Sequence, residues 1–220
     1  MTALVIFIAL VFAAVAFFFL RRALRARRER GTKRTQLRQE LASIRAALDE
    51  FEKATDFDDR IRLLADVGRY CARGFRLFPG ETAIMEIDRA CQDERRKLVQ
   101  AWVVEESQRL MKFVEESANL RAKAGRADQV AECIKVASRY LFPHERITNA
   151  MRSVVQYQEA MEALLELPEE QRQLALAGLQ SLLDPYFRIM EELKRDNTEL
   201  AKVPWRGAGV RRLLEQLEKV

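Results

Sequence analysis

The chain has 220 residues, with 38 Lys or Arg against 33 Asp or Glu and a net charge of +5. Only eight Gly and five Pro are present, which argues against a β-sandwich or barrel, because those folds need turn residues about every 8–12 positions. Abundant straight-chain residues favour helix instead. We therefore expect an all-α protein: an N-terminal transmembrane helix followed by a cytoplasmic multi-helix bundle or a short solenoid of helical hairpins.

Residues 1–20 are interpreted as a transmembrane anchor. Residues 3–20 read ALVIFIALVFAAVAFFFL, without a charged or polar side chain. At a rise of about 1.5 Å per residue this run makes about 27 Å of helix, close to the ~30 Å hydrocarbon core of a bilayer. The alternative is a signal peptide cleaved after Ala14-Val15-Ala16. Against it, no basic residue precedes the run, and the run continues past that point to Leu20.

A basic juxtamembrane segment follows at residues 21–35. Its eight basic residues, against the single acid Glu29, are Arg21, Arg22, Arg25, Arg27, Arg28, Arg30, Lys33 and Arg34. By the positive-inside rule they place the N-terminus outside and the C-terminal domain in the cytoplasm. We interpret the segment mainly as a topology determinant at the lipid headgroups, with recruitment of particular anionic lipids as the alternative. Because the excess charge is concentrated here, it does not indicate a nucleic-acid binder.

Residues 36–55 are expected to form a short amphipathic, coiled-coil-like helix. Its apolar residues are spaced 4, 3, 4 and 3 apart, namely Leu37, Leu41, Ile44, Leu48 and Phe51. This is an a/d seam, but it is shorter than the three to four heptads, roughly, that identify a coiled coil. The seam is therefore either a partner or oligomer contact or a face that packs on the chain's own domain.

Residues 56–197 carry successive amphipathic stripes and are expected to form one helical domain. Asp56 and Asp58 offer N-caps for its first helix. A very long helix is expected from about Glu81 to Ala124, with Gly125 as its C-cap. Asp184-Pro185 is expected to kink or restart a later helix, because proline interrupts the backbone hydrogen bonds.

The sequence Leu-Phe-Pro-x-Glu occurs twice, at residues 77–81 and 141–145. Each copy ends one apolar stripe and begins the next, since proline disfavours helix for the residue before it and suits the first turn of a new helix. The two copies are either equivalent corners of a duplicated hairpin or two independent solutions of the same turn.

Residues 198–209 are interpreted as a linker, and residues 210–220 as a C-terminal amphipathic helix. The candidate docking residues of this region are Trp205, Val210, Leu213, Leu214 and Leu217. Such a helix binds either the chain's own domain or a groove on another protein.

No constellation of residues indicates chemistry. Cys71, Cys91 and Cys133 lack CxxC spacing, so we expect buried free thiols, with one disulfide as the alternative. The single histidine, His144, has no neighbouring ligands for a zinc site. Adjacent acids point about 100° apart on a helix, so they do not pair their carboxylates. We expect no catalytic, cofactor-binding or metal-binding residues and no cofactor, and we do not expect an enzyme.

The sequence thus favours a single-pass membrane-anchored helical scaffold or adaptor that binds a protein partner, or a second copy of itself, at the cytoplasmic membrane face. The expected partners are the bilayer and a protein, with no nucleic acid and no evident small-molecule substrate. The alternative is a pore-forming or membrane-perturbing effector that acts through an oligomerising span. Residues 3–20 contain no GxxxG and no polar residue to line a pore, which weakens that alternative.

Overall fold

The computed structural model describes residues 2–141 and 145–219 of the chain; the side chains of residues 2–17, 19, 20, 23, 24, 26, 27, 30, 174 and 177 lie outside that description. Every regular element in this part of the chain is a helix, so the all-α prediction is confirmed. The elements in chain order are α1 (Thr2–Lys53), α2 (Phe57–Leu77), α3 (Thr82–Glu116), α4 (Leu120–Ser138), α5 (Glu145–Leu165), α6 (Glu169–Leu179), η1 (Gln180–Leu183), α7 (Asp184–Ala201) and α8 (Gly207–Glu218).

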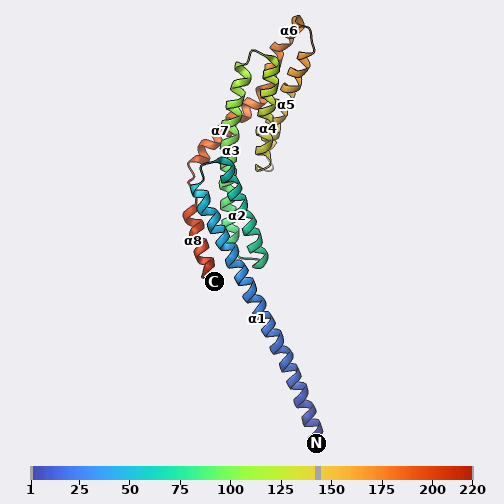
Figure 1. The fold of residues 1–220 in the computed structure, drawn as a ribbon, viewed down its shortest axis with the longest axis vertical. Coiled ribbons are helices and arrows are strands. Elements are labelled where there is room, and N and C mark those ends of the chain that lie inside the picture. The colour runs from blue at the N-terminus through green and yellow to red at the C-terminus, as the bar shows by residue number, and fades with distance from the viewer. Residues whose placement is uncertain (1, 142–144, 220) are drawn as a thin grey trace.

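The first helix, α1, is continuous through the anchor, basic and seam segments expected from the sequence. Its 52 residues extend over about 78 Å at the helical rise of 1.5 Å. The N-terminal part of α1 projects alone from the body of the molecule (Figure 1). Apart from Phe18, the side chains of the predicted anchor, residues 3–20, lie outside the description. In the part of the chain that the structure describes, none of the helices combines the length and the apolar character that crossing a membrane requires.

The helices pack into two lobes. The lobe nearer the projecting end of α1, here the proximal lobe, contains α1 from Leu37 onward, α2, the first half of α3, and α8 (Figure 1). Its buried apolar residues form one cluster: Leu37, Leu41, Ile44, Ala47, Leu48, Phe51, Leu63, Leu64, Val67, Cys71, Ile84, Ile87, Cys91, Val210, Leu214 and Leu217. This core joins the beginning of the chain to its end.

The second lobe, here the distal lobe, contains the second half of α3 together with α4, α5, α6, η1 and α7. Its largest fully buried side chains are Met111, Ile134, Leu141, Ile147, Tyr157, Leu183 and Tyr186. Helix α3 passes through both lobes (Figure 1), and the first turn of α2 also reaches the distal core through Phe57 and Ile61. The arrangement is consistent with the helical-bundle form of the prediction.

The expected single helix from about Glu81 to Ala124 is wrong. Helix α3 ends at Glu116, and Ser117 has extended backbone angles, φ −69° and ψ 127°. Asn119 then caps α4: its Oδ1 accepts hydrogen bonds from the backbone N–H of Arg121 at 2.8 Å and of Ala122 at 3.3 Å. Gly125 lies inside α4 and ends no helix. The capping preference of asparagine outweighs an apolar pattern that runs across the break.

Two further helix boundaries concern the start of α7 and the connection between α7 and α8. Pro185 lies in the first turn of α7, where a missing N–H is tolerated, so Asp184-Pro185 restarts the helix after η1. The linker expected at residues 198–209 is shorter in the structure, because α7 continues to Ala201 and α8 begins at Gly207.

The two Leu-Phe-Pro-x-Glu segments are only partly comparable. The first, at residues 77–81, forms the turn between α2 and α3, where Gly80 has a φ of 97° that favours glycine. The second includes residues 142–144, and therefore His144, which lie outside the described residues.

Candidate protein-binding groove

A groove runs along the proximal lobe between α3 on one side and α8 with the preceding 202–206 connection on the other. We call it the α3–α8 groove. Its lining residues are Glu86, Arg89, Ala90, Asp93, Glu94, Arg96 and Lys97 from α3, and Leu200, Val203, Pro204, Trp205, Arg206, Gly209, Val210, Arg212, Leu213 and Gln216 opposite. It comprises two hollows of about 190 Å³ and about 550 Å³, which share Ala90, Asp93 and Arg206.

The α3 wall of the groove is one face of a helix. Residues 86, 90, 93 and 97 are separated by three or four positions, and so are residues 89, 93 and 96, so the two rows form a single stripe along the helix. Helix α8 runs in the opposite direction to α3, so the two helices form parallel walls (Figure 1). Between these walls, Ala90 and Gly209 are the small residues of the lining.

Helix α8 is fixed in place by apolar and polar contacts. Val210, Leu214 and Leu217 are at most 5% exposed and pack into the proximal core. On the α1 side, Arg211 forms ion pairs of 2.7 Å with both Asp49 and Glu52. These contacts turn the opposite face of α8, which carries Arg212 and Leu213, toward the groove.

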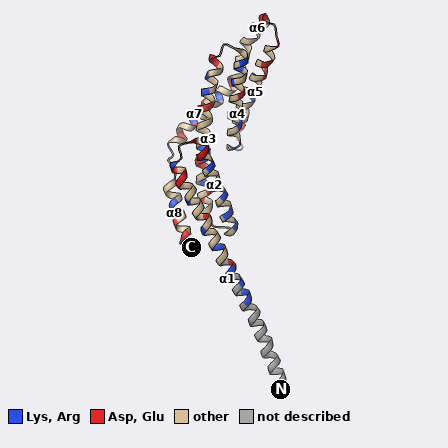
Figure 2. Cartoon of the chain, in the orientation of Figure 1, with Lys and Arg blue, Asp and Glu red and all other residues tan. Residues whose placement is uncertain are grey.

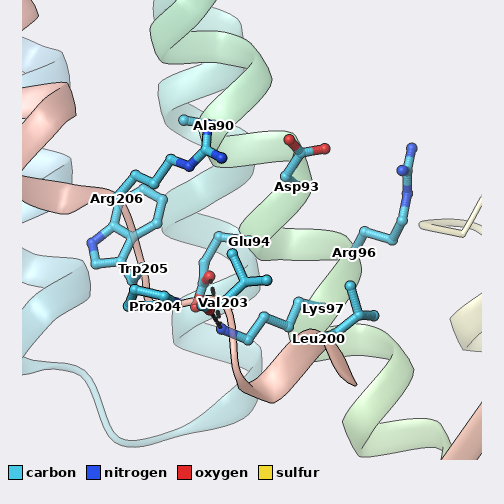
Figure 3. Close-up of a pocket in the computed structure, with 10 residues that line it drawn as sticks. All are labelled: Ala90, Asp93, Glu94, Arg96, Lys97, Leu200, Val203, Pro204, Trp205 and Arg206. Carbon is cyan, nitrogen blue, oxygen red and sulfur yellow. Dashed lines mark hydrogen bonds and ion pairs between the residues drawn. The ribbon is translucent and has the colours of Figure 1, made fainter. Parts of the chain in front are cut away.

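The upper end of the groove is closed by a polar tie between α3 and the 202–206 connection. The Lys97 Nζ donates a hydrogen bond of 2.8 Å to the carbonyl oxygen of Val203 and lies 3.6 Å from Glu94 Oε2 (Figure 3). Glu94 is 8% exposed, so the lysine supplies the partner that a buried carboxylate requires. This tie holds the connection against α3.

Trp205 forms the wall of the groove beside this tie. Its ring packs edge-on against Phe51, with centroids 5.7 Å apart and an interplanar angle of 69°. Its Nε1 comes so close to Gly207 that a Cβ there would lie only 2.4 Å away. Figure 3 shows Trp205 and Arg206 on one side of the hollow, with Asp93, Arg96 and Lys97 projecting from α3 on the other.

The exposed charges of the groove are mainly basic. Four arginines line it, and none of them forms an ion pair among the described residues: Arg89, Arg96, Arg206 and Arg212. The acids outside the Glu94–Lys97 pair are Glu86 and Asp93, so the lining carries a positive excess. Val203, about half exposed at 49%, adds an apolar surface at one end.

The seam predicted over residues 37–51 lies inside the chain's own core. Leu37, Leu41, Ile44, Leu48 and Phe51 are between 1% and 8% exposed, in the same cluster as residues of α2 and α8. Of the two alternatives for this seam, the structure has the intramolecular one.

The candidate docking helix packs against that same core. Val210, Leu214 and Leu217 are buried, while Leu213 and Trp205 are partly buried. The structure thus brings together the seam and the C-terminal helix, which the sequence alone presents as separate sites.

The basic residues of the predicted juxtamembrane segment lie on the part of α1 that no other described helix covers (Figure 2). The exposed ones are Arg21, Arg22, Arg25, Arg28, Lys33 and Arg34. The side chains of Arg27 and Arg30 lie outside the description. No described helix of either lobe covers this segment.

The three cysteines are free and buried. Burial raises the pKa of Cys91 and of Cys133 to about 12, and it raises the pKa of Cys71 as well. Protonated thiols are poor nucleophiles, so none of the three resembles a catalytic cysteine. In the described part of the chain, no group of His, Cys, Asp and Glu is arranged to hold a metal ion.

Sequence reasoning missed the α3–α8 groove. Its charged residues look like an ordinary solvated helix face, and the helix that forms the other wall lies more than a hundred positions later. No protein-family model, curated protein or solved structure matches the chain. The groove, the projecting α1 and their charges are therefore the features from which a function is inferred.

Proposed function

We propose that the protein is a single-pass membrane-anchored helical scaffold or adaptor that binds a partner protein at the cytoplasmic membrane face. One observation carries the proposal: α1 is a single helix that joins the apolar run at residues 3–20 to the core of the proximal lobe. An uninterrupted helix couples the position of the lobes to that of the bilayer. The α3–α8 groove is the surface offered to the partner.

The length of α1 supports this arrangement. Residues 21–36, here the stalk, lie between the apolar run and the first buried residue, Leu37. Sixteen helical residues extend over about 24 Å, whereas the headgroup layer of one leaflet is about 5–8 Å thick. An anchored chain would therefore hold its proximal lobe clear of the headgroups, with the groove open to the cytoplasm.

The distribution of charge around the stalk also supports a helix that crosses the headgroups. At about 100° per residue, the eight basic residues fall on all sides of α1. One side has Arg21, Arg25 and Arg28, the next has Arg22 and Lys33, and the remaining sides have Arg27, Arg30 and Arg34. A helix lying in the plane of the interface gathers its cations on one face. A complete ring suits a helix that stands across the interface.

The membrane-active alternative has less support. An oligomerising span uses small-residue motifs or polar side chains, and residues 3–20 contain neither GxxxG nor a polar residue. The seam at residues 37–51 is buried in the chain's own core, so it is not free to join copies of the chain.

Membrane insertion is tested by alkaline carbonate extraction of the full chain, followed by detergent. We expect the chain to stay in the membrane pellet and to be released by detergent only. The variant Ala9→Arg with Ala13→Arg should become extractable, because each arginine near the centre of a span costs about 2.5–3.5 kcal/mol. Release of the unaltered chain by carbonate would overturn the proposal.

Orientation is tested with a membrane-impermeant maleimide, since the native thiols are buried. Thiols introduced by Thr2→Cys and Asp58→Cys report on the two sides. We expect the first to react in intact cells and the second to react only after permeabilisation. The reverse pattern would contradict the cytoplasmic assignment.

Replacing residues 3–20 with an unrelated span separates the two candidate functions. An adaptor keeps its co-purifying partner, because the span only locates the lobes. A membrane-active effector loses its activity although it stays in the membrane. Loss of the partner together with retained membrane location would favour the effector.

A further inference from the structure

We infer that the α3–α8 groove binds an acidic amphipathic helix of the partner protein, about three turns long. This inference rests on the proposed adaptor function and specifies the chemistry of the partner. The inference follows from the length of the groove, from the small and apolar residues that line it, and from its charge.

The length of the groove sets the length of the bound segment. From Glu86 to Lys97 the α3 wall covers twelve residues, and the eleven helical rises between them span about 16 Å, or about three turns. A helix that lies between two others needs small residues beneath it, because packed helix axes are only about 8–10 Å apart. Ala90 lies on one wall and Gly209 on the other. A Cβ added at Gly209 would meet no atom within 4 Å, so the space above it is open.

The apolar part of the groove suits the hydrophobic face of such a helix. Val203 is 49% exposed, and Trp205, Leu200 and Leu213 are partly buried. These side chains lie at the end of α7, in the connection and on α8, so they extend along one wall. An amphipathic helix docks with residues at i, i+3, i+4 and i+7 on such a surface.

The charges of the groove select the polar face of the helix. The rim arginines, Arg89, Arg96, Arg206 and Arg212, are exposed and form no ion pair among the described residues. Lys97 is already occupied by Glu94 and by the Val203 carbonyl. Carboxylates on the partner would pair with the arginines, whereas lysines would meet like charge. Glu86 and Asp93 reduce the selectivity but leave the rim basic.

The test compares two fluorescein-labelled helical peptides of fifteen residues that share one leucine stripe. One carries glutamate on its polar face and the other carries lysine. Fluorescence anisotropy measures their binding to the full chain in a non-ionic detergent. We expect the glutamate peptide to bind about tenfold more tightly, because its carboxylates can form several exposed ion pairs with the rim arginines. The preference should weaken as salt is added.

Charge-reversal variants test whether the preference for the glutamate peptide arises in the α3–α8 groove. Arg89→Glu combined with Arg212→Glu should invert it, and Arg89→Gln combined with Arg212→Gln should abolish it with less risk to folding. The matched control is Arg121→Glu with Arg195→Glu, which reverses two exposed arginines of the distal lobe. The control should leave the tenfold preference unchanged.

Several outcomes would overturn the inference: absence of binding by either peptide, equal binding of both, or a preference that survives the groove reversal. A change of oligomeric state in the groove variants, measured by light scattering, would assign the groove to a second copy of the chain instead. Because the assay is carried out in detergent, it does not depend on membrane insertion. Carbonate extraction of the same chain shows separately whether the anchor proposal fails.

Discussion

The proximal and distal lobes are both helical, but they are assembled from the chain in different ways. The distal lobe is made of successive neighbours, since α4 packs on α3 and α5 packs on α4, before α7 returns to pack on α5 and α3. The core of the proximal lobe, in contrast, combines residues of α1 near the beginning of the chain with residues of α8 at its end. Its ion pair between Arg45 and Glu218, at 2.9 Å, joins residues 173 positions apart. Because this core combines the two ends of the chain, its stability depends on α8.

The two lobes also differ in what they bury. The proximal core is mostly aliphatic, and Gly74 lets the side chains of Leu37 and Ile84 approach α2 within 3.4 Å of its would-be Cβ. The distal core contains two fully buried tyrosines and a serine, Ser107, whose hydroxyl donates to Met190 Sδ at 3.4 Å. The proximal lobe is therefore sensitive to loss of an element, and the distal lobe to loss of a single large side chain.

The largest expected effect comes from ending the chain at Arg206, which removes α8. Val210, Leu214 and Leu217 are at most 5% exposed, and burying each contributes about 1.5–3 kcal/mol, so the loss is about 4.5–9 kcal/mol. Hydrogen exchange should become fast in α2 and in α1 after Leu37, while α4 and α5 stay protected.

A chain that ends at Glu218 is the matched control and should exchange like the full chain. Equal loss of protection in both lobes would mean that the two cores unfold as one unit. In that case the contrast between the lobes would not hold.

The next effect concerns Tyr186, which is fully buried in the distal lobe. Tyr186→Ala should destabilise the protein by about 3–5 kcal/mol through the cavity that it leaves. Tyr186→Phe should change stability little, because the buried hydroxyl has no hydrogen-bond partner among the described residues. Urea unfolding measures both variants. A loss above about 1 kcal/mol for the phenylalanine variant would show that the hydroxyl is bonded after all.

The helices and their faces were largely predictable from the sequence. Asp56 was expected as an N-cap, and its side chain accepts a hydrogen bond of 3.1 Å from the Asp59 N–H. The apolar stripes at residues 37–51 and 210–217 were expected as buried or docking faces, and both are in one core. Periodicity detects such faces because it depends only on local spacing.

Which apolar helix face packs against which other face was not predictable from the sequence. The two stripes are each amphipathic and lie about 160 residues apart, so either one also suits a partner in another chain. Their pairing is accompanied by ion pairs of Arg211 with both Asp49 and Glu52, which no local pattern encodes. The break at residues 117–119 was missed for another reason: the apolar pattern continues across it, and only the cap at Asn119 marks it.

A smaller effect tests how closely the groove wall is packed. In Gly207→Ala the new Cβ would lie 2.4 Å from Trp205 Nε1 and 2.9 Å from its Cδ1, so the ring must move, at a cost of about 1–3 kcal/mol. Gly209→Ala is the matched control: it meets no atom within 4 Å and should stabilise α8 by about 0.5–1 kcal/mol. Urea unfolding followed by Trp205 fluorescence, with Trp102→Phe as background, measures both. Equal effects of the two alanines would show that Trp205 is free to shift.

The smallest effect separates the lobes by pH, since Cys71 and Cys91 are in the proximal core and Cys133 is in the distal one. Burial raises all three pKa values, with Asp88 raising the first two further and Glu106 raising that of Cys133. The folded chain therefore keeps thiol protons that the unfolded chain releases near pH 9.0. The resulting stability is fully present below that pH and is lost as pH rises through the range from 9.0 to about 12.

Between about pH 8 and about pH 9.5, each thiol should lower the free energy of unfolding by about 0.8 kcal/mol. The proximal lobe contains two of the three thiols, so it should lose about twice as much stability as the distal lobe. Staying below the ordinary tyrosine pKa of 10.0 limits the contribution of Tyr157 and Tyr186, whose pKa values burial also raises. Fluorescence of Trp205 and of Trp102, each as the only tryptophan, reports on the two lobes during urea unfolding. Cys71→Ala with Cys91→Ala should remove the additional alkaline loss at Trp205 and leave the response at Trp102 unchanged. If the additional loss persists in that variant, groups other than the thiols set the difference between the lobes.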